Sequence, residues 1–284
     1  MRSVTCVGAT DILVTFHGVR GSTPCHGPDT LRYGGNTSCV SIQVPGAAPI
    51  VCDMGTGLRY FGEQWKETGR PFVGTALLTH LHWDHVQGIP FFPPIFDAST
   101  EVDVYGPVQE DGVSLQDAMR SVVKPPTFPV GLDILPGKYR FHDVMNADFT
   151  VGDVSIKARA VPHIGPTVGY RIEWAGRVVT YISDHQQNYD GSFGITNEVR
   201  ELVEGADLLI HDSQYTTEEF RQKYYWGHCT PEFAMSIAQS CGVKRLALFH
   251  HDPTRTDDAL DALASCGFAG VEVFAARENQ TVAV

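Results

Sequence analysis

Short apolar runs, each closed by glycine, proline or polar residues, recur along most of the chain. Runs of this kind, about four to eight residues long, are typical of buried β-strands. The pattern predicts strands over residues 11–19, 39–44, 50–53, 74–78 and 245–249, a strand pair within 149–160, and a hairpin of 167–174 with 177–182 across Ala175-Gly176.

Helical patterns separate these strands. Thr216 with Glu219 forms a capping box, and Thr230-Pro231 places a cap before a proline at the first helical position. Residues 86–96 contain too many prolines for a helix beyond its first turn. Their phenylalanines are expected to pack in the core or at its rim; the alternative is an aromatic face for a substrate base or a dimer contact. Helices are predicted over residues 58–68, 114–124, 196–204, after Thr216, 230–242 and 257–266.

The most informative stretch, residues 79–85, follows the predicted strand 74–78 and reads Thr-His-Leu-His-Trp-Asp-His. His80 and His82, two positions apart, can converge on one metal ion from an irregular loop. Asp84 and His85 could serve a second ion about 3.5–4 Å away, the usual spacing in two-metal hydrolytic sites. Mixed nitrogen and oxygen ligands suit zinc, and also manganese or iron.

Three more ligand-type side chains, His163, Asp184 and His250, each follow a predicted strand. Loops at strand ends commonly carry site residues on a rigid scaffold. Of the adjacent His250 and His251, only one is expected to be a ligand, and His250 stands directly after its strand.

The order His-x-His-x-Asp-His, a lone histidine, a lone aspartate and a late histidine resembles the metallo-β-lactamase superfamily, and most closely its ribonuclease Z and phosphodiesterase branch. The resemblance runs from about residue 16 to the C-terminus. It implies an α/β (α+β) fold with four layers, an αββα sandwich of two packed sheets with helices on both outer faces. The metal ions would lie in a cleft at one edge.

The resemblance also implies a role for each ligand. His80, His82 and His163 would hold one divalent ion, Asp84, His85 and His250 the other, and Asp184 would bridge them. The nucleophile would be a water or hydroxide shared by the ions, which Asp84 could also orient. Asp53 would support the metal loop by orienting a ligating imidazole.

Outside the ligands, Gly227-His228-Cys229-Thr230 resembles the ribonuclease Z motif whose histidine, paired with an acidic residue, protonates the leaving oxygen. Asp212 matches the acidic partner, where the family usually has glutamate. His185 and His211 lie beside matched positions and could touch substrate. The glycine-rich loop 18–24 could cradle an anion with Arg20; the alternative is an ordinary turn.

The net charge and the spacing of the motifs limit which nucleic-acid partners are expected. The net charge of −12 argues against long nucleic acid, which is usually gripped by a basic patch. The interval between His163 and Asp184 is filled by the predicted hairpin, which leaves no room for the tRNA-gripping arm of long-armed ribonuclease Z enzymes.

Because the ligands span residues 80–250, we expect one domain over residues 1–284. An odd count of seven cysteines and the lack of a signal-peptide or membrane-spanning run predict a cytoplasmic protein. The family analogy predicts a homodimer.

The favoured function is a dinuclear metal-dependent phosphodiesterase that cleaves small phosphodiesters such as cyclic nucleotides. The first alternative is a ribonuclease Z-like RNA nuclease, which would need a basic surface. The second is a lactone, ester or thioester hydrolase of the same fold, which would be insensitive to loss of His228. A metal-binding sensor without catalysis would show a broken ligand set, and the set is complete.

Overall fold

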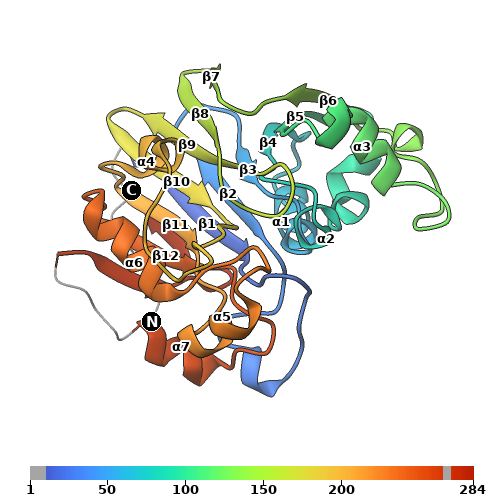
Figure 1. The fold of residues 1–284 in the computed structure, drawn as a ribbon. Helices are drawn as coiled ribbons and strands as arrows, with labels where there is room; N and C mark the ends of the chain where they lie inside the picture. Colours follow the sequence, from blue (N-terminus) through green and yellow to red (C-terminus); the bar gives the residue numbers. More distant parts are fainter. Residues whose placement is uncertain (1–10, 265–269) are drawn as a thin grey trace.

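Two β-sheets form the centre of the computed structural model, which describes residues 11–264 and 270–284. Over these residues each sheet has seven strands (Figure 1). The first sheet is ordered β14 (Thr281–Ala283), β1 (Leu13–Gly18), β2 (Cys39–Gln43), β3 (Ile50–Cys52), β4 (Val73–Leu77), β5 (Glu101–Gly106) and β6 (Lys138–Asp143). The second is ordered β13 (Glu272–Ala275), β12 (Arg245–Phe249), β11 (Leu208–Asp212), β10 (Arg177–Ile182), β9 (Val168–Trp174), β8 (Val154–Ala160) and β7 (Ala147–Val151).

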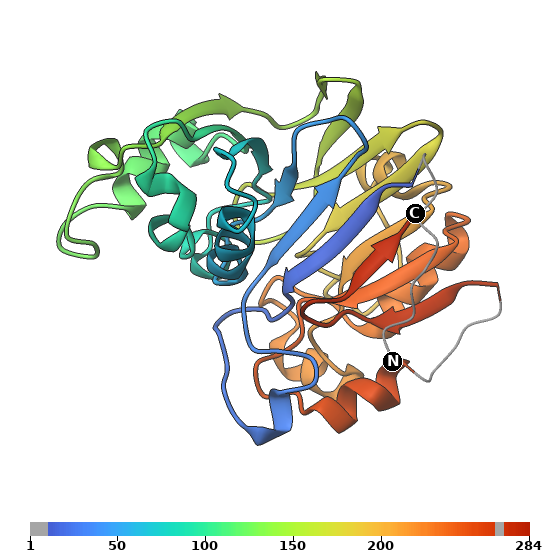
Figure 2. The ribbon, with the colours of Figure 1, turned by 180° about the vertical axis from the view of Figure 1, so that it is seen from behind.

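Strand direction decides where the loops gather. Strands β3 to β6 run parallel to one another, and so do β10 to β13. In such sheets the crevice beyond the carboxyl ends of the strands is the usual place for a ligand. The last strand, β14, pairs with β1 rather than with β13, so the C-terminal segment joins both sheets (Figure 2).

Apolar side chains fill the space between the two sheets. Phe16 and Phe249, from opposite sheets, lie with ring centroids 6.2 Å apart, and Tyr170 and Tyr181 are fully buried beside them. The Tyr170 hydroxyl donates to the carbonyl of Leu78 over 2.7 Å, which links β9 to the end of β4 across the core.

Helices cover the outer face of each sheet (Figure 1). Helices α1 and α3 pack on the first sheet, and α4 and α6 pack on the second. The result is the predicted four-layer αββα sandwich, which is confirmed. The helices are α1 (Gly57–Lys66), α2 (Trp83–Val86), α3 (Leu115–Val122), α4 (Asn197–Val203), α5 (Thr217–Lys223), α6 (Pro231–Ser240) and α7 (Asp257–Ala264).

Local signals in the sequence place several of these elements correctly. The β9–β10 hairpin turns at Ala175-Gly176, where both residues have positive φ, as a type I′ hairpin loop requires. The capping box of α5 and the Thr230 cap of α6 are both present. Residues 86–96 hold the last residue of α2 and two 3-10 turns, with Phe92 in the core and Phe91 and Phe96 exposed.

Strands β5, β6, β13 and β14 are not predicted by the sequence analysis; in β5 and β6, charged residues alternate with the apolar ones. Arg140 on β6 forms ion pairs with Asp103 and Glu101 on β5, and Lys138 pairs with Glu101. Such cross-strand pairs stabilise the two strands on the face that carries Tyr105, whereas Val102 and Phe141 on the other face pack under the helices. The first ten residues and the end of the predicted helix 257–266 lie outside the described residues. No helix within 11–264 or 270–284 is long and apolar enough to cross a bilayer.

Candidate active site

Loops at one edge of the sandwich bring the predicted ligands together. The first sheet supplies four of them and the second sheet three. His80 and His82 follow β4, Asp84 and His85 lie on α2, His163 follows β8, Asp184 follows β10, and His250 follows β12.

Asp184 lies at the centre of this group. Its Oδ1 is 3.8 Å from the Nε2 atoms of both His80 and His163. Its Oδ2 is 3.2 Å from Nε2 of His85 and 3.5 Å from Nε2 of His250. One carboxylate oxygen therefore faces each half of the histidine cluster, which is the arrangement expected of a group shared by two ions.

The second ring nitrogen of each of four histidines is held from behind. In each case Nδ1 lies within hydrogen-bond distance of a fixed partner, which leaves Nε2 directed into the site. This is the usual outer support of metal-binding imidazoles, and it fixes both ring orientation and tautomer. The pairs are His80 with the Thr79 hydroxyl (3.0 Å), His85 with Asp53 (2.8 Å), His163 with the Gly227 carbonyl (2.6 Å) and His250 with Gln214 (2.7 Å).

The centre also carries buried polar atoms without partners. Over residues 11–264 and 270–284, Nε2 of His80, Nε2 of His85 and both carboxylate oxygens of Asp184 lack a hydrogen bond. Buried polar atoms are normally satisfied, so an unsatisfied group of this kind calls for a bound species. Nitrogen and carboxylate donors converging at this spacing fit divalent metal ions.

The pKa values of the histidines differ between the two halves of the cluster. Burial lowers the pKa of His80 well below its usual value and that of His163 to about 4, so both rings are neutral, as metal ligands must be. Burial also opposes charge on His85, but the neighbouring carboxylates, Asp84 foremost, outweigh it and raise its pKa. This part of the site therefore stabilises positive charge, whether a proton or an ion carries it.

Asp53 lies behind the metal loop, as the sequence analysis expects. One carboxylate oxygen accepts from the Thr79 backbone N–H over 2.8 Å, and the other contacts His85 Nδ1 over 2.8 Å. The Tyr181 hydroxyl donates to it over 2.9 Å. Asp53 is fully buried. Through these contacts it ties the loop to both sheets, and it does not itself reach the centre.

The glycine-rich loop 18–24 reaches the site through its backbone rather than through Arg20. The Ser22 N–H donates to Asp84 Oδ2 over 2.7 Å, and the same oxygen lies 3.0 Å from His250 Nε2. Gln214, which the sequence analysis missed, binds both the Ser22 hydroxyl and His250 Nδ1. An amide side chain at that position carries no sequence signal of such a role.

His228 and Asp212 form a buried pair next to the cluster. His228 Nδ1 lies 3.1 Å from Asp212 Oδ2 and 3.6 Å from Asp184 Oδ1. Asp212 also accepts from the backbone N–H groups of His185 and Gln214, which fix its carboxylate. With Nδ1 engaged, Nε2 is the ring nitrogen of His228 left for another partner.

The side chains of Arg20 and His185, which the sequence analysis considered as anion and substrate contacts, do not line the site. Arg20 is fully buried and donates to the carbonyls of Gly34, Asp252 and Arg255, so its guanidinium is used in holding loops together. His185 is buried and its ring pairs with His211 over 3.0 Å. Neither side chain can meet a substrate in this arrangement. His251 likewise turns away, with Nε2 against the Ala276 carbonyl, which leaves His250 facing the site.

Gln186 is a second residue that the sequence analysis missed. Its side chain accepts from the Gly227 N–H over 2.7 Å and donates to the Tyr224 carbonyl over 2.7 Å. Its own N–H donates to the Pro162 carbonyl over 2.6 Å. It therefore joins the segment before His228 to the segments that carry Asp184 and His163.

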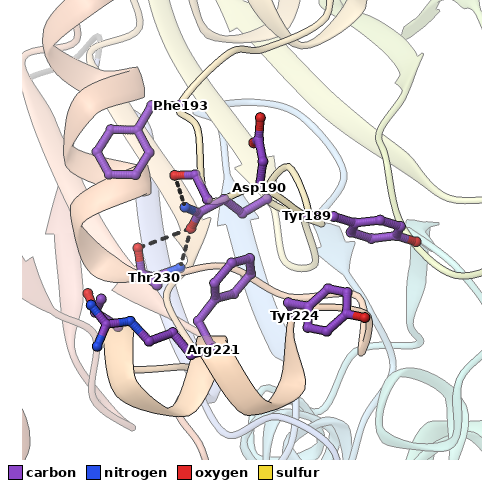
Figure 3. Close-up of a pocket in the computed structure, with 10 residues that line it drawn as sticks. Tyr189, Asp190, Phe193, Arg221, Tyr224 and Thr230 are labelled. Carbon is purple, nitrogen blue, oxygen red and sulfur yellow. Dashed lines mark hydrogen bonds between the residues drawn. The ribbon is translucent and has the colours of Figure 1, made fainter.

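A cavity of about 400 Å³ adjoins this region (Figure 3). Its wall includes Gln187, whose N–H donates to the His228 carbonyl and whose side chain binds Thr230. Tyr189 and Tyr224 line one side of the cavity, while Phe193 and the Arg221 guanidinium lie on the other (Figure 3).

Comparison with known proteins decides the family. Residues 50–251 match the Beta-lactamase superfamily domain, and these residues include every proposed ligand. The chain belongs to the β-lactamase superfamily. Superfamily membership and the ligand cluster together identify a hydrolase whose fold implies divalent metal ions.

Among the relatives of this superfamily member, a ribonuclease Z from Natronomonas pharaonis is 27% identical and covers 95% of this chain and 96% of the relative. Among solved structures, the metallo-beta-lactamase fold protein YhfI from Bacillus subtilis has a TM-score of 0.73 at 19% identity, over 97% of this chain and 100% of that one. A diphosphatase from the PhnP family has a TM-score of 0.69 at 18% identity, over 96% of this chain and 97% of that one. The two structures support the fold.

Proposed function

We propose that this superfamily member is a phosphodiesterase that cleaves small phosphodiesters such as cyclic nucleotides. The observation that carries the proposal is the His228–Asp212 pair beside a complete ligand cluster. An alkoxide leaving group needs a proton, and a positioned histidine is well suited to supply it near neutral pH. The names of the ribonuclease Z relative and the PhnP-family diphosphatase agree with phosphoester chemistry.

The same residues support a two-ion site. We assign His80, His82 and His163 to one ion, Asp84, His85 and His250 to the other, and Asp184 to both. Bound there, two divalent ions would polarise phosphoryl oxygens and lower the pKa of bound water. Zinc fits the donor set best, and manganese or iron share it. Because the ligands come from both sheets, we also propose that the chain forms one domain.

The chain's own residues handle the protons. Asp212 holds the Nδ1–H of His228, so that Nε2 can donate to the leaving oxygen. Asp84, fixed by the Ser22 N–H, lies where it can orient the attacking water. The −12 net charge favours a small substrate over a long polyanion.

His228→Ala tests the proton donor. We expect normal metal content and a fall in kcat of about 10²-fold or more on a phosphodiester with an alkoxide leaving group. With p-nitrophenolate, which barely needs a proton, the loss should be much smaller. Equal losses on both substrates would contradict the assignment, and metal analysis of the variant separates it from a ligand defect.

Turnover of 3′,5′-cyclic AMP by the metal-loaded protein, with a chelated sample beside it, tests the substrate class. Chelator-sensitive release of a nucleoside monophosphate is the expected result. The ribonuclease Z relative, aligned over nearly the whole chain, favours short RNA as the second candidate. Cleavage of a short RNA without turnover of cyclic AMP would establish that alternative.

A further inference from the structure

Four exposed aromatic side chains gather on the segments that flank His228 and Asp184. Tyr224, Tyr225 and Trp226 immediately precede Gly227-His228, and Tyr189 follows Asp184 by five positions. Their exposed fractions are 42%, 53%, 50% and 65%. We call Tyr189, Tyr224, Tyr225 and Trp226 the aromatic rim. Exposed aromatic surface gathered in one place commonly marks a binding site.

The aromatic rim is tied directly to the proposed metal ligands. Gln186 holds its backbone at the Tyr224 carbonyl and the Gly227 N–H. The Gly227 carbonyl contacts His163 Nδ1, and a Cβ on Gly227 would lie 2.4 Å from the His163 ring. Trp226 therefore directly precedes Gly227, which contacts the proposed ligand His163.

The rings of the aromatic rim support one another. Tyr224 lies edge-on to Tyr189, with centroids 5.7 Å apart, and edge-on to Tyr225, at 5.2 Å. The Lys223 ammonium lies 5.5 Å from the Trp226 ring centroid and 3.7 Å from an Asp252 carboxylate oxygen, which anchors the indole. Figure 3 shows Tyr189 and Tyr224 side by side on the same side of the cavity.

We propose that the aromatic rim is a subsite that stacks on the planar base of a nucleotide whose phosphate lies at the ligand cluster. The proposal rests on the proposed function for the phosphate and adds the base to it. Rim members are uncharged, so they select for a flat ring rather than for further phosphates. Stacking of one base on an aromatic side chain is worth about 5- to 150-fold in affinity.

Binding to the metal-loaded protein tests the subsite without relying on turnover. AMP and ribose 5-phosphate share a sugar and a phosphate and differ in the base. By calorimetry we expect the wild type to prefer AMP by at least about fivefold. Trp226→Ala and Tyr224→Ala should remove most of that preference and leave ribose 5-phosphate binding unchanged, whereas Trp226→Phe should retain part of it. Tyr60→Ala, an exposed aromatic on α1, is the matched control and should keep the preference.

Tryptophan fluorescence gives an independent readout. AMP should quench the wild type more than ribose 5-phosphate does, and the difference should disappear in Trp226→Phe but persist in Trp83→Phe. The reverse pattern, or equal wild-type affinity for the two ligands, would overturn the subsite. A base-dependent preference that depends on the aromatic rim in a protein that hydrolyses no phosphodiester would instead refute the proposed function and leave the subsite standing.

Discussion

Asp53→Asn is the sharpest test of how the site prepares its ligands. A carboxylate only accepts hydrogen bonds, so Asp53 requires the proton of His85 to sit on Nδ1, 2.8 Å away. The Nε2 lone pair then faces the cluster. Asparagine keeps the shape and tolerates the left-handed backbone at this position, where φ is 56°. Its amide nitrogen, however, favours the opposite tautomer of His85, with the proton on Nε2.

The expected loss follows from these contacts. Loss of an outer-shell partner typically lowers metal affinity by 10- to 100-fold, about 1.4–2.7 kcal/mol. The metal-free protein should also lose about 1–3 kcal/mol of unfolding free energy, because an amide N–H now meets the donors of Thr79 or Tyr181 in a fully buried position.

Metal affinity would be measured by competition with a chromophoric chelator, and stability by urea unfolding of the chelated protein. Tyr181→Phe is the matched control, because it removes one hydrogen bond to Asp53 and leaves the His85 tautomer in place. It should cost about 1 kcal/mol of stability and leave metal affinity within about threefold of the wild type. Wild-type affinity in Asp53→Asn, or an equal loss in Tyr181→Phe, would refute the tautomer argument.

Three further outcomes are expected. Gly227→Ala should displace His163 and abolish activity, whereas Gly242→Ala, also at positive φ but with open space around it, should cost only about 1 kcal/mol and keep activity. Burial lowers the pKa of His17 to about 4, below the value of about 6.5 expected in the unfolded chain. As the pH falls from about 6.5 to 4, the unfolded chain therefore binds a proton first, and up to about 3 kcal/mol of unfolding free energy is lost. In urea unfolding across this range, His17→Gln should show a weaker pH dependence. Loading the chelated protein with Zn²⁺ should raise its Tm in a concentration-dependent way, and an unchanged Tm would argue against the site.

The sequence locates the proposed ligands because few side-chain types suit divalent metal ions and four of the seven positions lie within six residues of one another. Histidine and aspartate directly after a buried strand have few other uses, and parallel strands deliver such residues to one edge. Arg20 shows where this reasoning stops. Its loop has the composition of an anion cradle, yet its guanidinium is fully buried, with Nε and Nη1 donating to the carbonyls of Gly34, Asp252 and Arg255, contacts that only the tertiary fold creates. The role of Gln186 is missed for a different reason, since an amide side chain has no distinctive sequence signal.

The aromatic rim illustrates the same limit on a larger scale. Tyr-Tyr-Trp before Gly227 lies just beyond the end of a short helix, and sequence alone does not tell whether such rings pack inward or remain exposed. Their exposure and their connection through Gln186 become visible only when three loops from distant parts of the chain are placed together.

The proposed ligands come from both sheets, so the distance between the sheets affects the geometry of the proposed metal site. The first sheet carries the His80–His85 group and the second carries His163, Asp184 and His250, so the core between them sets how far apart the two groups stand. Tyr170 reaches across that core and donates to the carbonyl of Leu78, which lies two residues before His80. Its side chain therefore helps to set the distance between the two sheets at this point. A change of side-chain volume there would move one ligand group against the other. The catalytic rate would then change with small shifts in core packing that barely alter the Tm.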